Sequence, residues 1–514
     1  MDNNKVEPED EMDIEQADDD DQFEDIDEDD DSSGEDDDDS SEEEEEGGVV
    51  LGGGGEGKQT KKQKLAKIKA EMKSKSKPAD DSSASTSKKK DKSKKKAYLP
   101  GMLIAEGESL ICDESAYTTL HTFTTSAPCL SFDIIRPDGG GNDRTTFPLT
   151  SYLVSGTQAQ RSHANNLIVM KLSNVYKTKP KGSDDELSDD ESDGGDEEDD
   201  AMTKKPELVA ALVPHHGCVN RLKFRFVGER PLVATWSELG KVSIWDIGVP
   251  LRVLDNGEHL QDYIKSKEKP KPLFTFKGHR GEGFALDWSP TMPGVLASGD
   301  NTKFIHIWRP HESGWLVDQR PFSAHTASVE DIQWSRSEQH VFASCSVDKS
   351  IRIWDARSPP NKGSMLCRPD AHAKDINVIS WNGKDPFLAS GGDDCALKVW
   401  DLRSFSSATV DPVAEFSHHH KGPICSVEWS PHESSVLASA GEDDQVAIWD
   451  LALEKDAEEE GGGNDEDEAA VPPQLLFIHQ GQQDIKEVHW HDQIPGVLFT
   501  TSATGFNVLK PVNL

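Results

Sequence analysis

The 514-residue sequence contains little of what builds disulfide-linked, secreted or membrane-spanning proteins. Its seven cysteines are scattered and form no Cys-x-x-Cys pair, so they fit reduced, apolar fillers of strands better than a disulfide framework or a zinc site. No apolar run is long enough to span a bilayer, and the acidic N-terminus lacks the apolar segment of a signal peptide. These absences predict a protein that works in a reducing compartment and outside the membrane.

The sequence also lacks the motifs of common enzymes. It contains no phosphate-binding loop between a strand and a helix, and the Gly-rich segments at 139–142 and 391–394 are typical of turns. The histidine triplet at 418–420 has no cysteine or carboxylate at the spacing of zinc ligands. We therefore expect no catalytic residues, no cofactor, no metal site and no enzymatic activity.

Charge is abundant but very unevenly distributed along the chain, whose net charge is −41. Residues 1–47 hold 28 acids against one lysine, residues 184–200 hold 12 acids, and residues 454–468 hold 9. Residues 58–96 reverse the balance, with 16 lysines against 4 acids. Blocks of like charge at this density repel themselves and cannot collapse into a core. We predict that they are disordered or looped out of the folded part.

The charge blocks suggest the domain boundaries. We predict a disordered tail at 1–97, acidic and then lysine-rich, followed by one folded domain at 98–514 with acidic loops at 182–201 and 454–470. Within the tail, Lys88 to Lys96 reads KKKDKSKKK and resembles a nuclear-import signal, for which Lys61 to Lys69 could form a second half. The alternative is a solvated basic tail that touches nucleic acid only electrostatically.

The folded part is organised around a repeat that is clearest at His325 to Arg357. It recurs at 372–403 and 420–450, and the closing tryptophans, Trp354, Trp400 and Trp449, lie 46 and 49 residues apart. Each repeat begins at a histidine 28 or 29 residues before its tryptophan and contains short alternating strands separated by turns. Such repetition is the signature of a β-propeller, in which each repeat forms one four-stranded blade.

Weaker copies of the repeat complete the ring. A degenerate blade spans 128–172, and two further blades close at Trp245 and Trp308. The last blade, from 477, has only three strands before the chain ends, and we expect 117–124 to supply its outer strand. The predicted fold is therefore an all-β, seven-bladed WD-repeat propeller.

Each regular blade contains a His, a Ser, an Asp and a Trp at matched positions. A Ser/His/Asp set suggests a hydrolase, but three copies at one spacing indicate a structural hydrogen-bond network that is needed in every blade. Asp300 comes two residues early in the 279–308 blade, and only Glu238 stands near that place in the 216–245 blade, so the network is not predicted there with the same pattern. The three predicted sets are His325, Ser344, Asp348 and Trp354; His372, Ser390, Asp394 and Trp400; and His420, Ser439, Asp443 and Trp449.

Two arginines end consecutive blades. Arg357 and Arg403 stand in WDAR and WDLR, which resemble the WD-x-R motif of substrate receptors for a cullin-type ubiquitin ligase, and they are candidate adaptor-binding residues. The alternative is that each arginine pairs with a neighbouring acid.

The acidic loops are the candidate client-binding segments. Mobile carboxylates around a rigid ring attract basic proteins and compete with nucleic acid for them, whereas the alternative is that they only confer solubility. Ser183 and Ser188 each precede Asp-Asp-Glu and are candidate phosphorylation sites. The acids chosen as client-binding are Asp184, Asp185, Glu186, Asp189, Asp190, Glu191, Asp465, Glu466, Asp467 and Glu468.

Four segments resemble glutamate-rich WD-repeat proteins, which are relatives of the histone-binding WD-repeat chaperones. The matching segments are 98–135, 149–159, 399–403 and 472–481, which keep their order along the folded part. The resemblance implies a seven-bladed propeller found in the nucleus and nucleolus, which acts in large ribosomal subunit biogenesis and escorts a newly made ribosomal protein, large-subunit protein three. It also implies histone binding.

The resemblance extends to a client clasp. In the histone-binding relatives a loop ending in paired prolines and an N-terminal helix hold a basic helix, and Pro472 and Pro473 match those prolines. The N-terminal helix is not matched, because the region before Tyr98 is rich in lysine. In the last repeat the turn histidine falls on Gly481, with His479 two residues early, so no full network is expected there.

The sequence thus predicts a monomeric, non-enzymatic nuclear chaperone for a basic ribosomal protein. The client would be large-subunit protein three, with histones and pre-ribosomal particles as further partners, and without a small-molecule substrate or a membrane. Two alternatives stay open: a histone-binding chromatin chaperone, and a substrate receptor of a cullin-type ubiquitin ligase.

Overall fold

A computed structural model describes residues 112–136, 144–178, 205–405, 411–454 and 471–514. These residues belong to one compact unit, Lys96–Leu514. The predicted tail at 1–97, the acidic loop at 182–201 and all but the first residue of the acidic loop at 454–470 lie outside the described residues.

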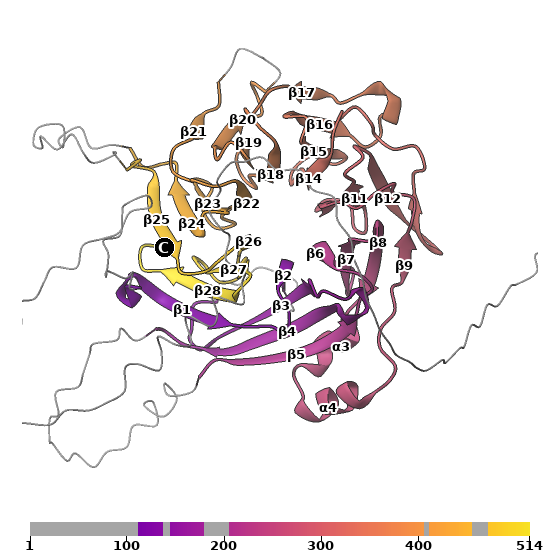
Figure 1. Cartoon of the computed structure of the whole chain (residues 1–514), viewed down its shortest axis with the longest axis vertical. Helices are drawn as coiled ribbons and strands as arrows, with labels where there is room; N and C mark the ends of the chain where they lie inside the picture. Colours follow the sequence, from indigo (N-terminus) through magenta and orange to yellow (C-terminus); the bar gives the residue numbers. More distant parts are fainter. Residues whose placement is uncertain (1–111, 137–143, 179–204, 406–410, 455–470) are drawn as a thin grey trace, which may run out of the picture. The chain divides into compact units, whose positions relative to one another are not determined.

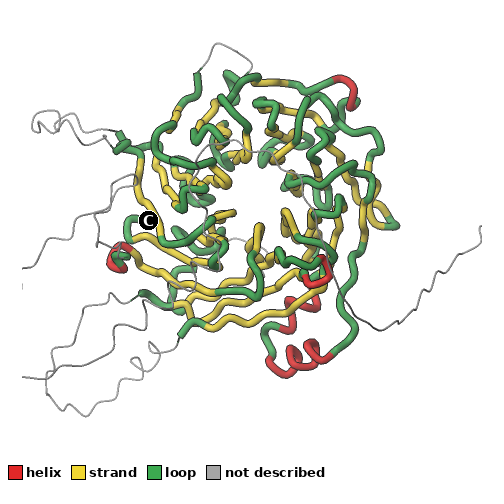
Figure 2. Tube along the Cα trace, in the orientation of Figure 1, coloured by secondary structure: helices red, strands yellow, loops and turns green. Residues whose placement is uncertain are grey.

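The described residues form seven four-stranded antiparallel sheets, which surround a central opening (Figure 1). The first strand of each sheet faces the centre, and each such inner strand contacts the inner strand of the next sheet, including β26 with β2. Figure 2 shows the strands radiating from the centre, with loops at the rim. The structure confirms the predicted seven-bladed propeller.

The first four sheets use strands from the N-terminal part of the ring. They contain β2 (Cys129–Ile135), β3 (Leu149–Thr157), β4 (Asn166–Val175) and β5 (Glu207–Pro214); β6 (Val219–Val227), β7 (Arg230–Ser237), β8 (Lys241–Asp246) and β9 (Phe274–Phe276); β10 (Ala285–Trp288), β11 (Leu296–Gly299), β12 (Ile305–His311) and β13 (Gly314–Val317); and β14 (Val329–Trp334), β15 (Val341–Ser346), β16 (Ile351–Asp355) and β17 (Leu366–Arg368).

The other three sheets complete the ring. They contain β18 (Ile376–Trp381), β19 (Phe387–Gly392), β20 (Leu397–Asp401) and β21 (Ala414–Phe416); β22 (Ile424–Trp429), β23 (Val436–Gly441), β24 (Gln445–Asp450) and β25 (Leu475–Gln480); and β26 (Ile485–Trp490), β27 (Leu498–Ser502), β28 (Gly505–Pro511) and β1 (Tyr117–Phe123). Short 3-10 helices lie at Glu114–Ala116, Ser162–Ala164 and Pro360–Lys362.

The last sheet joins the two ends of the folded chain. Strand β1 pairs antiparallel with β28 from Tyr117↔Pro511 to Phe123↔Phe506. The C-terminal blade therefore receives its outer strand from the N-terminal side, as the sequence predicted. This exchange gives β28 a partner along an edge that would otherwise be left open.

The core lies between the blades rather than at one centre. One cluster, for example, packs Ala343 and Ile353 of one blade against Ile376, Ile379 and Leu388 of the next. Burying one large apolar side chain contributes about 1.5–3 kcal/mol, so each blade depends on its neighbours for stability. The largest fully buried side chains are Trp236, Trp308, Trp334, Trp354 and Trp449.

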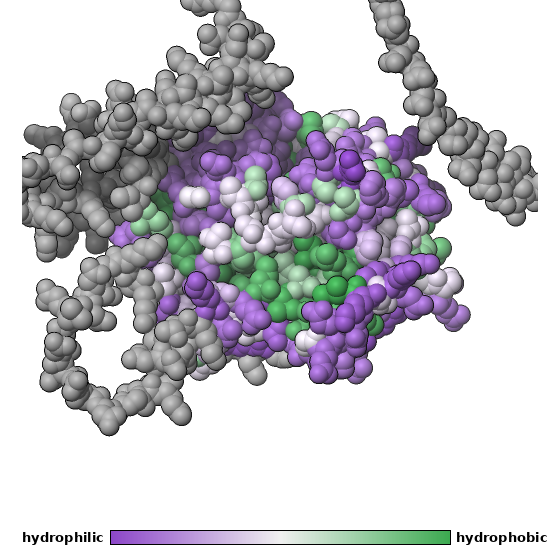
Figure 3. Space-filling model, turned by 60° about the horizontal axis from the view of Figure 1, so that its bottom comes forward, coloured by the Kyte–Doolittle hydropathy of each residue, from purple (hydrophilic) through white to green (hydrophobic). Residues whose placement is uncertain are grey.

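Two helices, α3 (Gly248–Val253) and α4 (Gly257–Lys265), were not predicted from the sequence. The side chain of Asn256 caps α4 by accepting from two backbone amides, and the Tyr263 hydroxyl donates to the carbonyl of Leu212 on β5 at 2.8 Å. Figure 3 shows apolar residues gathered on this side of the ring, where β5 presents Leu212 with 44% exposure. The helices thus cover part of an unusually apolar outer strand.

In the part of the chain that the structure describes, no helix is both long and apolar enough to cross a membrane. All seven cysteines are free, and Cys129, Cys218 and Cys345 are buried.

Candidate functional site: the central channel and its two mouths

The structure brings each predicted His, Ser, Asp and Trp set together. His325 Nδ1 lies 2.9 Å from Asp348 Oδ2, His325 Nε2 lies 2.7 Å from Ser344 Oγ, and Trp354 Nε1 donates to the same oxygen at 2.8 Å. Burial alone would raise the pKa of Asp348, but its bonds to His325 and Ser350 hold it well below its usual range. The same contacts join His372, Ser390, Asp394 and Trp400, and His420, Ser439, Asp443 and Trp449.

A fourth complete network exists in the preceding blade, where the sequence pattern did not predict one. His279 Nδ1 lies 2.9 Å from Asp300 Oδ2, and Ser298 Oγ contacts both His279 Nε2 at 2.7 Å and Trp308 Nε1 at 2.9 Å. Asp300 follows its serine after two positions instead of four, yet its carboxylate reaches the same ring nitrogen. Its other oxygen accepts the amides of Thr302 and Phe304, which folds the turn around it.

Two other blades have partial substitutes. Thr235 Oγ1 takes the place of the serine, 3.0 Å from Trp245 Nε1 and 3.2 Å from His215 Nε2. Glu238 does not join this network, because it accepts the backbone amide of Cys218. In the last blade, Gln482 replaces the turn histidine and bonds to Thr500 and Ser502.

Side chains on the inner strands tie each blade to the next. The inner strand is an edge of its own sheet, so its amides need acceptors from elsewhere. Asp287 accepts the amide of Trp334 at 2.7 Å, Asp331 that of Ile379 at 3.1 Å, Glu428 that of Trp490 at 2.8 Å, and Glu487 that of Phe132 at 2.8 Å. These contacts join positions that match from blade to blade, so all inner strands run in the same direction along the channel.

The common direction gives the channel two distinct mouths. We call the opening at the first residues of the inner strands the start mouth, and the opening at their last residues the end mouth. The third strand of each blade runs in the same direction as the first, because each sheet is antiparallel with neighbours in chain order. Residues that follow a third strand therefore share the face of the end mouth.

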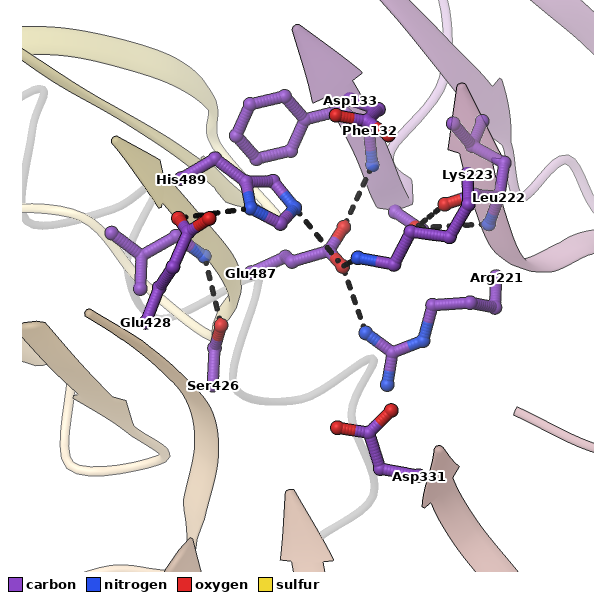
Figure 4. Close-up of polar contacts among 12 residues, drawn as sticks. Phe132, Asp133, Arg221, Leu222, Lys223, Asp331, Ser426, Glu428, Glu487 and His489 are labelled. Carbon is purple, nitrogen blue, oxygen red and sulfur yellow. Dashed lines mark hydrogen bonds and ion pairs between the residues drawn. The ribbon is translucent and has the colours of Figure 1, made fainter. Parts of the chain in front are cut away.

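The middle of the channel holds a buried ionic cluster from three blades (Figure 4). Glu487 Oε1 lies 2.8 Å from Arg221 Nη1, 3.6 Å from Lys223 Nζ and 3.3 Å from His489 Nε2. On its other side, His489 Nδ1 lies 3.1 Å from Glu428 Oε2. The Glu487 side chain is only 1% exposed, so its charge depends on these partners.

The cluster keeps both signs of charge inside the protein. Burial alone would raise the pKa of Glu487, but the charges of His489, Lys223 and Arg221 hold it well below its usual range. Burial alone would lower the pKa of His489, but Glu428 and Glu487 raise it to about 10. His489 is therefore an imidazolium at neutral pH, and the cluster is an ionic clasp between blades.

The start mouth is acidic. Glu330 is the second residue of β14, Asp375 immediately precedes β18, and Glu282 lies three residues before β10, where it accepts from Asn220 Nδ2 at 3.0 Å. Burial raises the pKa of Glu330, and the charges of Asp375 and Asp331 raise it further. Carboxylates are thus held together at a cost that a bound cation would relieve. Further acids on turns of this face are Asp393, Glu442, Asp444 and Asp484.

The end mouth is basic and leads into a cavity of about 380 Å³. Arg225 lies near the end of β6, Arg136 directly follows β2, and Arg336 follows β14 by two residues; all three line this cavity. Arg136 pairs with Asp492, and Arg225 donates to the carbonyl of Pro290 at 2.8 Å. The two mouths therefore carry opposite charge.

The candidate adaptor-binding arginines lie on the face of the end mouth, outside the channel. Arg357 forms a fork with Asp355, at 2.9 and 2.7 Å, and Arg403 forms the same fork with Asp401, at 2.9 and 2.6 Å. Their side chains are 66% and 70% exposed. Each arginine is therefore paired with the acid of its own blade while remaining accessible.

The client-binding segments chosen from the sequence are only partly described. Pro472 is half-buried and Pro473 exposed, in a turn where the amide of Leu475 donates to Pro472 O at 3.0 Å, just before β25. The structure gives no account of the chosen acids, which lie outside the described residues: Asp184, Asp185, Glu186, Asp189, Asp190, Glu191, Asp465, Glu466, Asp467 and Glu468.

Among the residues with described positions, no three His, Cys, Asp or Glu side chains are grouped as metal ligands. In the triplet, His420 belongs to a structural network, and burial lowers the pKa of His419 to about 4.

Ring, repeated networks and polar channel define a WD-repeat β-propeller. The family model for the WD domain, G-beta repeat, matches residues 317–355, 363–401 and 410–450, which are the three regular repeats. A second model, which describes the histone-binding protein RBBP4 or a component of the CAF1 complex, matches residues 107–176. Among solved structures, the chain is similar to the WD40 β-propeller domain of Doa1, with a TM-score of 0.48 and 16% identity over 77% of this chain and 96% of that one.

Curated relatives identify the family. The chain is 42% identical to glutamate-rich WD repeat-containing protein 1 of Dictyostelium discoideum, over 82% of this chain and 85% of the relative. It is 40% identical to ribosome assembly protein rrb1 of Schizosaccharomyces pombe, over 81% and 85%, and 43% identical to protein HEAT STRESS TOLERANT DWD 1 of Arabidopsis thaliana, over 82% and 92%. The chain belongs to the family of glutamate-rich WD-repeat proteins, as its sequence resemblance predicted.

Proposed function

We propose that this protein is a non-enzymatic assembly chaperone, which binds a newly made basic ribosomal protein and escorts it to the assembling large ribosomal subunit. The client is large-subunit protein three, and the protein acts as a monomer in the nucleus and nucleolus. The name of the fission yeast relative, a ribosome assembly protein, supports the process. The acidic start mouth supports the binding mode.

The start mouth is the observation that carries this proposal. Glu282, Glu330 and Asp375 come from three successive blades and stand at one opening of a rigid ring. A lysine or arginine segment entering there would relieve the mutual repulsion that raises the pKa of Glu330. The ring supplies a fixed spacing of carboxylates, and a basic client supplies the cations.

The acidic tracts extend this field. Asp184 to Glu191 and Asp465 to Glu468 would cover basic client surfaces that later meet ribosomal RNA, while Pro472 and Pro473 contact the client beside β25. Coulomb attraction of this kind is long-range and screened by salt. Ribosomal RNA would displace the chaperone, because its backbone offers a denser negative charge.

The first test is a nuclease-treated pull-down of the tagged protein from cells, with the stoichiometry of the bound proteins. One ribosomal protein at near-equimolar amount, without the rest of the ribosome, supports a dedicated escort. Equal recovery of core histones, or recovery of a cullin adaptor instead, contradicts it.

A second test locates the client surface. In the triple variant Glu282→Gln, Glu330→Gln and Asp375→Asn, we expect client affinity to fall at least tenfold and its dependence on salt to become shallower. The control replaces Glu258, Asp262 and Glu268, acids on or beside α4, by their amides. Equal affinity in both variants would exclude the start mouth as the binding surface.

Histone chaperoning is the second candidate, favoured by the histone-binding family model at 107–176. The paired prolines lie beside exposed apolar residues, since Val471 is 46% and Leu453 38% exposed. An amphipathic basic helix would find both apolar contact and nearby acids there. Competition between large-subunit protein three and a histone H3–H4 complex for a limiting amount of chaperone separates the two candidates.

A further inference from the structure

The end mouth concentrates positive charge in a protein that is otherwise strongly acidic. Three guanidinium groups, of Arg136, Arg225 and Arg336, line the same cavity, and they come from three different blades. Among the described residues at this mouth, one carboxylate, that of Asp492, forms an ion pair with them. The described part of the mouth therefore has two more cations than anions.

The carboxylates deeper in the channel do not neutralise this excess. Asp133 is engaged by backbone amides, since its Oδ1 accepts from Ile134 at 2.8 Å and its Oδ2 from Phe224 at 2.7 Å. Burial raises the pKa of Asp287 to about 7, so this side chain is only partly ionised near neutral pH. Glu487 is already paired with Arg221 and Lys223.

The arginines repel one another at the mouth. Burial lowers the pKa of Arg136, and the charges of Arg336 and Arg225 oppose the raising effect of Asp133. Burial likewise lowers the pKa of Arg225, and Arg336 lowers it further. The fold holds these cations together although they destabilise one another, and an anion between them would remove that cost.

We propose that the end mouth of the channel is a binding site for a phosphate group, held by Arg136, Arg225 and Arg336. A phosphate monoester carries nearly two negative charges at neutral pH and three terminal oxygens, which match an excess of two cations and three guanidinium groups. Guanidinium forks bind phosphate oxygens in pairs, whereas a single carboxylate would leave one cation unmatched. This site lies at the opposite end of the channel from the proposed client surface.

The test is calorimetric titration of the full-length protein with pyrophosphate at low ionic strength. We expect the Arg225→Gln/Arg336→Gln variant to bind at least tenfold more weakly than the unmodified protein. The matched control is Arg357→Gln/Arg403→Gln, which removes two arginines from the same face outside the channel and should leave the affinity unchanged. The lysine-rich tail is identical in all three proteins, so it cannot produce a difference between them.

Equal affinity in all three proteins would overturn the proposal. The single variant Arg336→Gln guards against misfolding, because this exposed side chain can be replaced without removing the bond from Arg225 to Pro290, and it should weaken binding at least threefold. A phosphoserine peptide that outcompetes pyrophosphate in the arginine-dependent site would identify a phosphorylated protein as the source, and the reverse order would identify a free polyphosphate. Binding of RNA alone, unaffected by the arginine substitutions, would also overturn the site.

Discussion

Arg221 on β6 and Glu487 on β26 are 266 positions apart in the sequence, yet Arg221 Nη1 lies 2.8 Å from Glu487 Oε1 inside the channel. The second oxygen of Glu487 accepts the amide of Phe132 on β2. One carboxylate thus connects the last blade of the ring to the first two. The closure of the propeller therefore depends on a buried ionic contact as well as on the pairing of β1 with β28.

Replacing Glu487 by glutamine should destabilise the ring strongly. The variant leaves Arg221, Lys223 and His489 without their shared anion, and removing one partner of a buried pair costs about 3–5 kcal/mol. Urea unfolding followed by circular dichroism measures the loss. The control is Asp484→Asn, which breaks the solvent-exposed pair with Lys486 and should cost at most about 1 kcal/mol. Similar losses in both variants would contradict the role of the clasp.

The stability of the protein should fall at alkaline pH because of His489. Its folded pKa of about 10 lies above the ordinary value of 6.5, so its contribution is complete below about pH 6.5 and disappears as the pH rises through about 10. Unfolding free energies between pH 6 and pH 10.5 should decline more steeply for the unmodified protein than for His489→Gln. The exposed His163→Gln variant should follow the unmodified protein, and parallel curves for all three would refute the prediction.

The network of His279, Ser298, Asp300 and Trp308 should be as important as the three regular ones. Ser298→Ala removes the oxygen that both Trp308 Nε1 and His279 Nε2 contact, and an unsatisfied buried polar group costs about 1–3 kcal/mol. We expect Ser344→Ala to show a loss of the same size in urea unfolding. Ser313→Ala, at an exposed position, is the reference with little change. A silent Ser298→Ala would mean that this network contributes nothing to stability.

Removing the exposed arginine forks should leave the fold intact. Arg357 and Arg403 contact only the acid two residues before them in the contacts that the structure describes. The double variant to alanine should therefore keep the thermal unfolding midpoint of the unmodified protein. Against that background, loss of a cullin adaptor from a pull-down would report directly on recognition, and a lowered midpoint would contradict the prediction.

Local spacing explains why much of the fold could be predicted. A blade is built from neighbouring strands and turns, so its His, Ser, Asp and Trp recur at fixed intervals, as in the blade of His325 and Trp354. The exchange of β1 into the last blade also followed from counting strands, because three strands before the end of the chain leave one place open. The Asp300 network escaped the count, since the turn conformation, rather than the position in the sequence, decides where that carboxylate points.

The sequence by itself determined the number of blades, the order of the strands and the three regular networks, because these depend on contacts within one repeat. Only the tertiary structure decided how the channel is charged. Arg221 and Glu487, or Arg136, Arg225 and Arg336, come from different blades and carry no mutual spacing in the sequence. They meet only when the ring closes and the inner strands align in one direction, which places acids at one mouth and arginines at the other.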